Sequence, residues 1–317
     1  MSPNLAQFSQ SALAQEMKAY TGRHAAKSFD WDAFPSNRDF AELARAQMRY
    51  VGGGGSPKAS GPETLKAERF TFSLIHMPVG KFAAAHSHEV VEHFLILGGV
   101  LTVGWVWGDE VIEVKLAPKD LVLNKLGRPH GFRNDGVDPV LMQITVGSGK
   151  PEPPVYTCHP KNKDIELARV FGAGAGKVYA FNPDSADPRQ QELARHVVRY
   201  SDRKPVWDAA GFARLAYVDE GGAPPQHYRM DMIHLPAGRG VQSYSREVEE
   251  TLFVLEGVLT VGWEQDGEVV EQHLGTRDLI FTPAGRRRYF RNDGVADVQF
   301  TMSVGAPQPE PVVFKAA

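Results

Sequence analysis

Three histidines and one glutamate are spaced so that they can bind a single metal ion. The pattern is His86-x-His88-x3-Glu92, with His130 further along the chain. Side chains two residues apart on a β-strand point to the same face, so both imidazoles and the carboxylate can face one interior. Three imidazoles and a carboxylate suit a divalent transition metal such as Fe2+, Mn2+, Ni2+ or Zn2+. In a six-coordinate ion, two positions would remain open for a substrate or dioxygen.

The elements that must position these ligands occur twice. Four pairs of similar segments are each separated by 158 positions: Ile75–Gly80 and Ile233–Gly238, Val100–Trp105 and Val258–Trp263, Phe132–Val137 and Phe290–Val295, and Pro151–Pro153 and Pro309–Pro311. One register kept over about 80 residues indicates an internal duplication. A weaker similarity relates the ELAR…RY segments that end at Tyr50 and Tyr200.

Each copy has the apolar alternation of short β-strands, for example from Phe70 to Leu74 and from Val140 to Val146. We therefore expect an all-β protein with two tandem jelly-roll-like β-barrels, an N-terminal helical extension and a partly helical linker. The expected divisions are 1–40 for the extension, 41–156 for the first barrel, 157–190 for the linker and 191–317 for the second barrel. The expected helices are Gln10–Tyr20, Arg38–Ala46, Lys163–Phe171 and Pro188–His196, and Val51–Pro62 is expected to be a mobile loop.

Two glycine-flanked motifs carry a resemblance to a known family. They are Gly80-x5-His86-x-His88-x3-Glu92-x6-Gly99 and Gly127-x2-His130-x3-Asn134. They resemble the two sequence motifs of the cupin superfamily, and the resemblance extends over both halves, roughly Arg45–Tyr156 and Leu193–Phe314. It implies a bicupin that holds one divalent metal in its first barrel, with Fe2+ favoured.

The second copy has lost most of the ligand types. His86 aligns with Tyr244, His88 with Arg246 and His130 with Arg288, while Glu92 is kept as Glu250. Arginine cannot be a metal ligand because it stays protonated. Our hypothesis is that Arg246 and Arg288 flank Glu250 and take the place of the metal electrostatically. The alternatives are that they bind an anionic ligand or face solvent.

Three further side chains are candidates for contacts with a substrate. Phe94 and Phe132 share the parity of the metal ligands, although a plain core role is favoured for Phe132 because Phe290 repeats it. Lys125 stands where the cupin motif usually has the proline that the second copy keeps as Pro283. A lysine there can meet a carboxylate or phenolate, or it can simply be solvated.

The resemblance suggests a non-haem Fe(II) dioxygenase that acts on a small aromatic or enolic substrate. The alternatives are a redox-neutral isomerase, decarboxylase or hydrolase, and a non-catalytic small-molecule-binding protein. Oxalate decarboxylase-like bicupins usually keep metal ligands in both halves, and gentisate dioxygenase-like bicupins typically lack the glutamate. Quercetin dioxygenase-like cupins carry three histidines and one glutamate, as here.

The composition excludes several other classes. The net charge of −3 provides no basic field for nucleic acid or an anionic membrane. No apolar run reaches the roughly 20 residues of a membrane helix, and the N-terminus lacks the order of a signal peptide. The single cysteine, Cys158, fits a reducing compartment. We expect a cytoplasmic protein with a small-molecule substrate and a possible homodimeric assembly.

Overall fold

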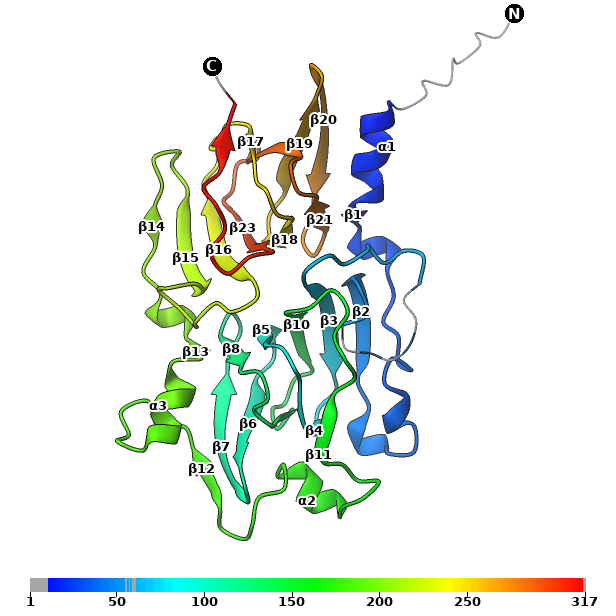
Figure 1. Cartoon of the computed structure of the whole chain (residues 1–317), viewed down its shortest axis with the longest axis vertical. Coiled ribbons are helices and arrows are strands. Elements are labelled where there is room, and N and C mark those ends of the chain that lie inside the picture. Colours follow the sequence, from blue (N-terminus) through cyan, green and yellow to red (C-terminus); the bar gives the residue numbers. More distant parts are fainter. Residues whose placement is uncertain (1–10, 55, 57, 59–60, 316–317) are drawn as a thin grey trace, which may run out of the picture.

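The computed structural model describes residues 11–54, 56, 58 and 61–315. Two β-barrels lie one above the other along the long axis of the molecule, each made from two mainly antiparallel sheets (Figure 1). This arrangement confirms the predicted all-β class with two jelly-roll-like barrels. No helix among the described residues is long and apolar enough to cross a membrane.

The first barrel contains two six-stranded sheets. Its strands are β2 (Ala46–Val51), β3 (Thr71–Met77), β4 (Phe82–Ser87), β5 (Glu92–Gly98), β6 (Leu101–Trp107), β7 (Glu110–Leu116), β8 (Leu121–Asn124), β9 (His130–Arg133), β10 (Val140–Val146), β11 (Val155–Cys158), β12 (Val178–Ala180) and β13 (Val197–Val198). The strand orders are β13-β8-β5-β10-β3-β2 and β11-β4-β9-β6-β7-β12.

The second barrel repeats this plan with a seven-stranded and a five-stranded sheet. Its strands are β1 (Thr21–Gly22), β14 (Val206–Trp207), β15 (Ala213–Val218), β16 (Arg229–Leu235), β17 (Tyr244–Ser245), β18 (Glu250–Glu256), β19 (Leu259–Gln265), β20 (Glu268–Leu274), β21 (Leu279–Thr282), β22 (Arg287–Arg291), β23 (Val298–Val304) and β24 (Val313–Phe314). The strand orders are β1-β21-β18-β23-β16-β15-β14 and β20-β19-β22-β17-β24.

The helices are short and lie outside the barrels. They are α1 (Ala12–Ala19), α2 (Ile165–Arg169), α3 (Pro188–Ala194) and the 3-10 turns η1 (His24–Ala26), η2 (Pro35–Asn37), η3 (Ala41–Leu43) and η4 (Tyr200–Asp202). Helix α1 begins after Ser11, whose hydroxyl accepts a hydrogen bond from the Ala14 amide, which is a typical N-cap. The predicted helices that contain α1, α2 and α3 are confirmed, except that Gln10 lies outside the described residues. Four positions of the loop expected over Val51–Pro62, namely 55, 57, 59 and 60, also lie outside them.

The helix predicted over Arg38–Ala46 is wrong. The segment forms only the single 3-10 turn η3 and then becomes extended, with Ala46 as the first residue of β2. Ala46 pairs with His76 on β3, and the buried Leu43 packs beneath the first barrel. Strand pairing and burial therefore override a helix preference that is weak in so short a segment.

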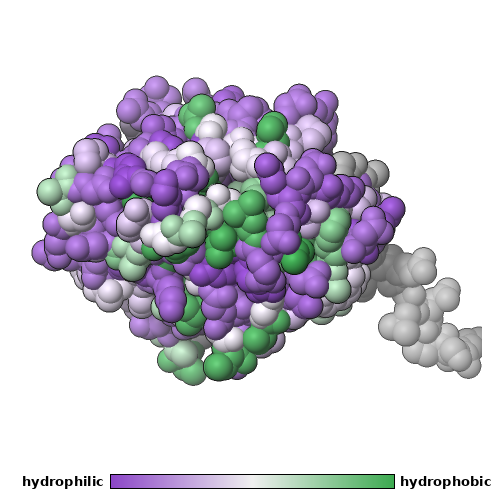
Figure 2. Space-filling view, turned by 90° about the horizontal axis from the view of Figure 1, so that it is seen from below, coloured by the Kyte–Doolittle hydropathy of each residue, from purple (hydrophilic) through white to green (hydrophobic). Residues whose placement is uncertain are grey.

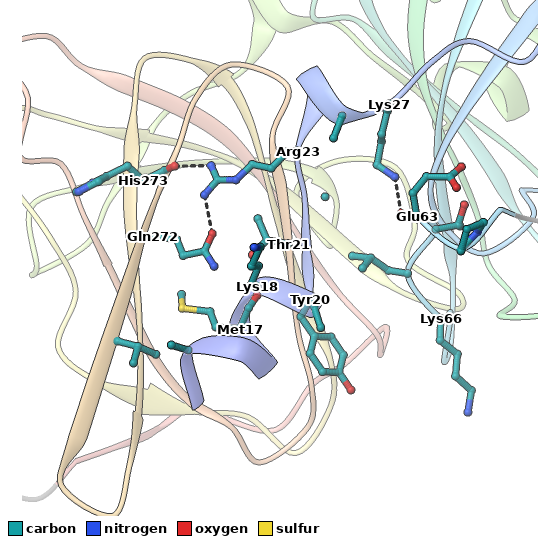
Figure 3. Close-up of a pocket in the computed structure, with 18 of the residues that line it drawn as sticks. Met17, Lys18, Tyr20, Thr21, Arg23, Lys27, Glu63, Lys66, Gln272 and His273 are labelled. Atoms are coloured by element: carbon teal, nitrogen blue, oxygen red, sulfur yellow. Dashed lines mark hydrogen bonds between the residues drawn. The ribbon is translucent and has the colours of Figure 1, made fainter. Parts of the chain in front are cut away.

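Each barrel receives a short strand from the segment that precedes the other barrel. Strand β1, ahead of the first barrel, pairs with β21 of the second, and β13, ahead of the second barrel, pairs with β8 of the first. The same N-terminal arm lies beside a groove of about 960 Å³ at the side of the second barrel. Figure 3 shows Arg23 of this arm reaching the His273 carbonyl and the Gln272 side chain.

The two barrels share an apolar interface between the sheet of the first barrel that contains β3 and the seven-stranded sheet of the second. Phe72 of the first barrel meets Phe253 of the second with ring centroids 4.9 Å apart, and Phe70 meets Tyr228 at 5.8 Å. The outer surface differs, because the end of the molecule seen in Figure 2 is mostly hydrophilic with apolar side chains in small separate groups. The barrels are thus held together by a core that continues through both.

We expect Phe253→Ala to lower the free energy of unfolding by about 3–5 kcal/mol, the usual cost of an emptied aromatic site in a packed core. The aromatic cluster belongs to both barrels, so both should still unfold in one transition, at a lower denaturant concentration. Denaturation followed by tryptophan fluorescence and by circular dichroism measures this. Val295→Ala, at a fully exposed position, is the control. Two separate transitions would contradict a shared core.

Candidate metal centre

The four predicted ligands come from the ends of three strands. His86 lies near the end of β4 and His88 follows one residue past it, while Glu92 begins β5 and His130 begins β9. The antiparallel pairing of β4 with β9 places His86 directly opposite His130. The chain turns between His88 and Glu92, so these side chains converge through the turn rather than along one strand.

The donor atoms of the four side chains all lie within 4.8 Å of one another. The Glu92 carboxylate lies 3.1 Å from His130 Nε2 and 3.6 Å from His88 Nε2. Each of the four residues is at least nine-tenths buried. Such a cluster of buried donors has the size and composition of a metal site rather than of a surface pair.

Backbone carbonyls fix the orientation of two of the rings. His86 Nδ1 hydrogen bonds to the Ala84 carbonyl at 2.8 Å, and His130 Nδ1 to the Arg128 carbonyl at 2.9 Å. A carbonyl can only accept, so each Nδ1 carries the proton and each Nε2 offers its lone pair to the centre. The residues present therefore fit a divalent cation.

Burial and neighbouring charges shift the pKa values of three ligands toward the protonation states that bind a cation. Burial, followed by the neighbouring rings of His130 and His88, lowers the pKa of His86 well below its ordinary value. Burial also lowers the pKa of His88. Burial alone would raise the pKa of Glu92, but His88 and His130 outweigh it and the pKa is lowered. His86 and His88 are thus neutral and Glu92 is ionised at neutral pH, which are the forms that bind metal.

A small cavity of about 30 Å³ opens beside the four ligands. Arg45 lines it, is only 6% exposed, and donates a hydrogen bond to the Leu43 carbonyl at 3.2 Å. Its guanidinium lies 4.1 Å from the centroid of the Phe34 ring, 5.8 Å from that of Phe132, and beside the Tyr156 hydroxyl. Among the described residues Arg45 has no carboxylate within 4.0 Å, so a buried positive charge faces the cavity without a directly paired anion.

The substrate-contact candidates have different positions. Phe132 lines the cavity, whereas Phe94 is buried behind it, with its ring centroid 4.8 Å from that of Phe132. Lys125 does not line the cavity. Its ammonium pairs with Glu192 of α3 at 2.9 Å on the outside of the barrel, so the structure does not bring Lys125 to the metal ligands.

Sequence reasoning missed Arg45 and Tyr156 as residues of the site. Tyr156 lies on β11, and its ring centroid is 5.7 Å from that of His86. Arg45 lies in the segment where a helix was expected, and the ELAR similarity paired it with Arg195 at the end of α3. The strand register gives Arg45 a different counterpart. No signal in the single sequence indicated that either side chain faces the metal ligands.

The second barrel holds an ion cluster at the equivalent place. Glu250 accepts hydrogen bonds from Arg246 at 2.7 Å, Arg288 at 2.8 Å and the Tyr244 hydroxyl at 2.6 Å. Glu250 and Arg288 are almost completely buried. Burial alone would raise the pKa of Glu250, but Arg288 and Arg246 lower it, so Glu250 stays ionised. The predicted pairing of two arginines with Glu250 is present.

We expect His86→Ala to lose one equivalent of bound divalent metal per chain, because a four-donor site with one imidazole missing binds far more weakly. Elemental mass spectrometry of protein purified without added metal measures the content. His76→Ala is the matched control, since His76 packs against Phe29 and Trp31 away from the site. Equal metal content in the wild type and His86→Ala would contradict the site.

Glu250→Ala is expected to destabilise the protein by about 3–5 kcal/mol, because it leaves the buried Arg288 and the partly buried Arg246 without their counter-ion. Chemical denaturation gives the change in the free energy of unfolding. Removal of the exposed Glu268 should change it by less than about 0.5 kcal/mol. If the two variants unfold alike, the cluster does not hold this barrel together.

Comparisons with known proteins agree with this geometry. The family model of the cupin domain matches residues 73–147 and 231–304, one match in each barrel. No curated protein matches the chain significantly.

Solved structures share the two-barrel fold at low sequence identity. The Lactobacillus farciminis oxalate decarboxylase formate complex has a TM-score of 0.64 at 12% identity, over 93% of this chain and 88% of that one. Oxalate decarboxylase from Bacillus subtilis at pH 4.6 gives 0.63 and 11%, over 93% and 78%. Vicilin from Corylus avellana (hazelnut) gives 0.55 and 11%, over 90% and 85%. The chain therefore belongs to the cupin superfamily and is a bicupin, with a buried metal site of three histidines and one glutamate in its first domain.

Proposed function

We propose that the first barrel is a metal-dependent site for a small carboxylate and that its reaction is a redox-neutral decarboxylation. The observation that carries the proposal is Arg45, a buried guanidinium without a carboxylate partner in the same cavity as the metal ligands. Guanidinium groups recognise carboxylates through parallel charged hydrogen bonds. A substrate carboxylate would supply the anion that Arg45 lacks.

The size of the cavity favours a substrate of few atoms. Its volume of about 30 Å³ is far below the several hundred Å³ of a typical pocket for drug-sized ligands. This argues against the aromatic substrate expected from the family resemblance. Two of the structures with the same fold are oxalate decarboxylases, one in complex with formate, and the Bacillus subtilis enzyme has Mn(II) centres. A carboxylate of about the size of oxalate and a metal such as Mn2+ are the substrate and cation that these observations favour.

Different residues of the first cavity would have different roles in this reaction. A divalent cation held by His86, His88, Glu92 and His130 would supply Lewis acidity toward a substrate oxygen. Arg45 would hold the carboxylate, and the rings of Phe34 and Phe132 would keep water from the cavity. When carbon dioxide leaves, its bonding electron pair stays on the remaining carbon, which must take up a proton. Tyr156 carries the hydroxyl among the cavity-lining side chains and is the candidate donor.

The first experiment is an assay of the metal-loaded protein with oxalate, malonate and oxaloacetate, with and without oxygen. We expect carbon dioxide release without oxygen uptake, and equal rates under nitrogen. Oxygen uptake in proportion to product would instead favour the Fe(II) dioxygenase that the family resemblance suggested. Binding of a carboxylate without any product would point to a non-catalytic binding protein.

Arg45→Gln should lower kcat/KM by about ten- to a hundred-fold, because a charged hydrogen bond to the carboxylate is worth about 1.5–3 kcal/mol. Metal content should stay at the wild-type level, since Arg45 is not a ligand. Lys125→Gln is the matched control, because Lys125 pairs with Glu192 outside the cavity and should leave kcat/KM unchanged. Full activity of Arg45→Gln would remove the basis of the proposal.

A further inference from the structure

The second barrel has a much larger cavity at the place that corresponds to the metal site. Its volume is about 950 Å³, against about 30 Å³ in the first barrel. Seven positions that line the first cavity have counterparts 158 residues later that line the second: Ile233, Tyr244, Arg246, Phe290, Met302, Val312 and Phe314. The two cavities are therefore copies of one internal space, and among the described residues only the first has a cluster of metal-ligand side chains.

Strand register identifies the counterpart of Arg45. Ala46 pairs with His76 in the first barrel, and Ala213 pairs with His234, its copy, in the second. The residue before Ala213 is Phe212, so a phenylalanine stands where the first barrel has its cavity arginine. Phe212 lines the second cavity, and its ring centroid lies 6.0 Å from that of Phe290.

The walls of the second cavity are aromatic. Phe212, Phe290 and Phe314 come from different segments, and Trp207 of β14, which is 61% exposed, stands at the opening. Tyr156 of the first barrel is replaced here by Phe314, so the wall has lost a hydroxyl. Because of these changes the second cavity has the volume and the apolar surface to hold a flat apolar group. The first cavity has neither.

Beside the cavity the second barrel carries a net positive charge, and one of the charged residues, Arg246, lines the cavity. Arg246 and Arg288 share the single carboxylate of Glu250, which leaves a net charge of +1. Arg246 bonds to Glu250 through Nε, and no other hydrogen-bond partner of its guanidinium is found among the described residues. Arg288 is 1% exposed and does not line the cavity, so it contributes charge but no direct contact. Arg246 lines the cavity, and its two terminal nitrogens can donate charged hydrogen bonds to an anionic ligand.

The other charged groups around the cavity do not cancel the positive charge of this cluster. On one wall Arg214 and Arg229 are matched by Asp219 and Asp231. Asp208 and Glu310 line the cavity but are exposed to solvent, where their charges are screened. The unmatched positive charge therefore lies at Arg246 and its cluster, in the same cavity lining as the aromatic side chains.

We propose that the second cavity binds an aromatic carboxylate. Its carboxylate would accept hydrogen bonds from the guanidinium of Arg246, which lines the cavity, and its ring would lie among the phenylalanines. The barrel that lost its metal would thus be a ligand-binding domain, independent of the reaction assigned to the first barrel.

Isothermal titration of the purified full chain with 2-naphthoate tests this, with the uncharged 2-naphthylmethanol as the matched probe. We expect one naphthoate per chain and at least tenfold weaker binding of the alcohol. Arg246→Met should weaken naphthoate binding at least tenfold, whereas Arg45→Met, which removes the arginine of the first cavity, should change it by less than twofold. Trp207→Ala, at an exposed position, should weaken it several-fold.

Several results would overturn the proposal. They are the absence of binding at millimolar naphthoate, equal affinity for the alcohol, wild-type affinity in Arg246→Met, or loss of binding in Arg45→Met. The last would place the ligand in the first barrel. If Arg246→Met does not fold, the comparison of the two probes on the wild-type protein still decides. Failure of the decarboxylase assay would not change any of these outcomes.

Discussion

In each barrel an antiparallel pair of strands holds two positions opposite each other at the barrel interior. In the first barrel the pair is β4 with β9, and it sets His86 against His130. In the second it is β17 with β22, and it sets Tyr244 against Arg288. A nearby glutamate completes the group in both cases. The backbone thus has the same geometry at this place in both barrels. The side chains at these positions determine whether the group binds a metal or forms an ion cluster.

The ion cluster shows how a barrel can lose a metal and keep its glutamate. A buried carboxylate needs positive charge beside it. In the first barrel a cation held by Glu92 and three imidazoles would provide that charge, and in the second the guanidinium groups of Arg246 and Arg288 do. Arginine supplies the positive charge but no open coordination positions. The ion cluster therefore cannot perform metal-dependent chemistry. What remains is one arginine of the cluster, Arg246, in the lining of a wide cavity, which suits recognition of an anion.

The sequence alone predicted the features that follow from periodicity and duplication. The 158-residue register indicated two barrels, and the histidine and glutamate spacing indicated the residues that meet at the first interior. It did not reveal Arg45, because that side chain reaches the cavity only through the pairing of β2 with β3 and its contact with Phe34. It offered Lys125 as a candidate for a substrate contact or as a solvated lysine, and in the structure Lys125 pairs with Glu192. Local sequence patterns do not show which distant segments come into contact, and the lining of a cavity depends on such contacts.

The exchange of short strands has a consequence for the order in which the chain is made. Strand β8 lies one place from the edge of its sheet, and β13, at residues 197–198, is the strand that covers it. During synthesis, all the other strands of that sheet are therefore made before β13, the last one, emerges. An uncovered edge offers free amide and carbonyl groups to any other strand, including one on a neighbouring nascent chain. The linker contains β13, so it also covers the exposed edge of β8. It does so well before the second barrel is complete.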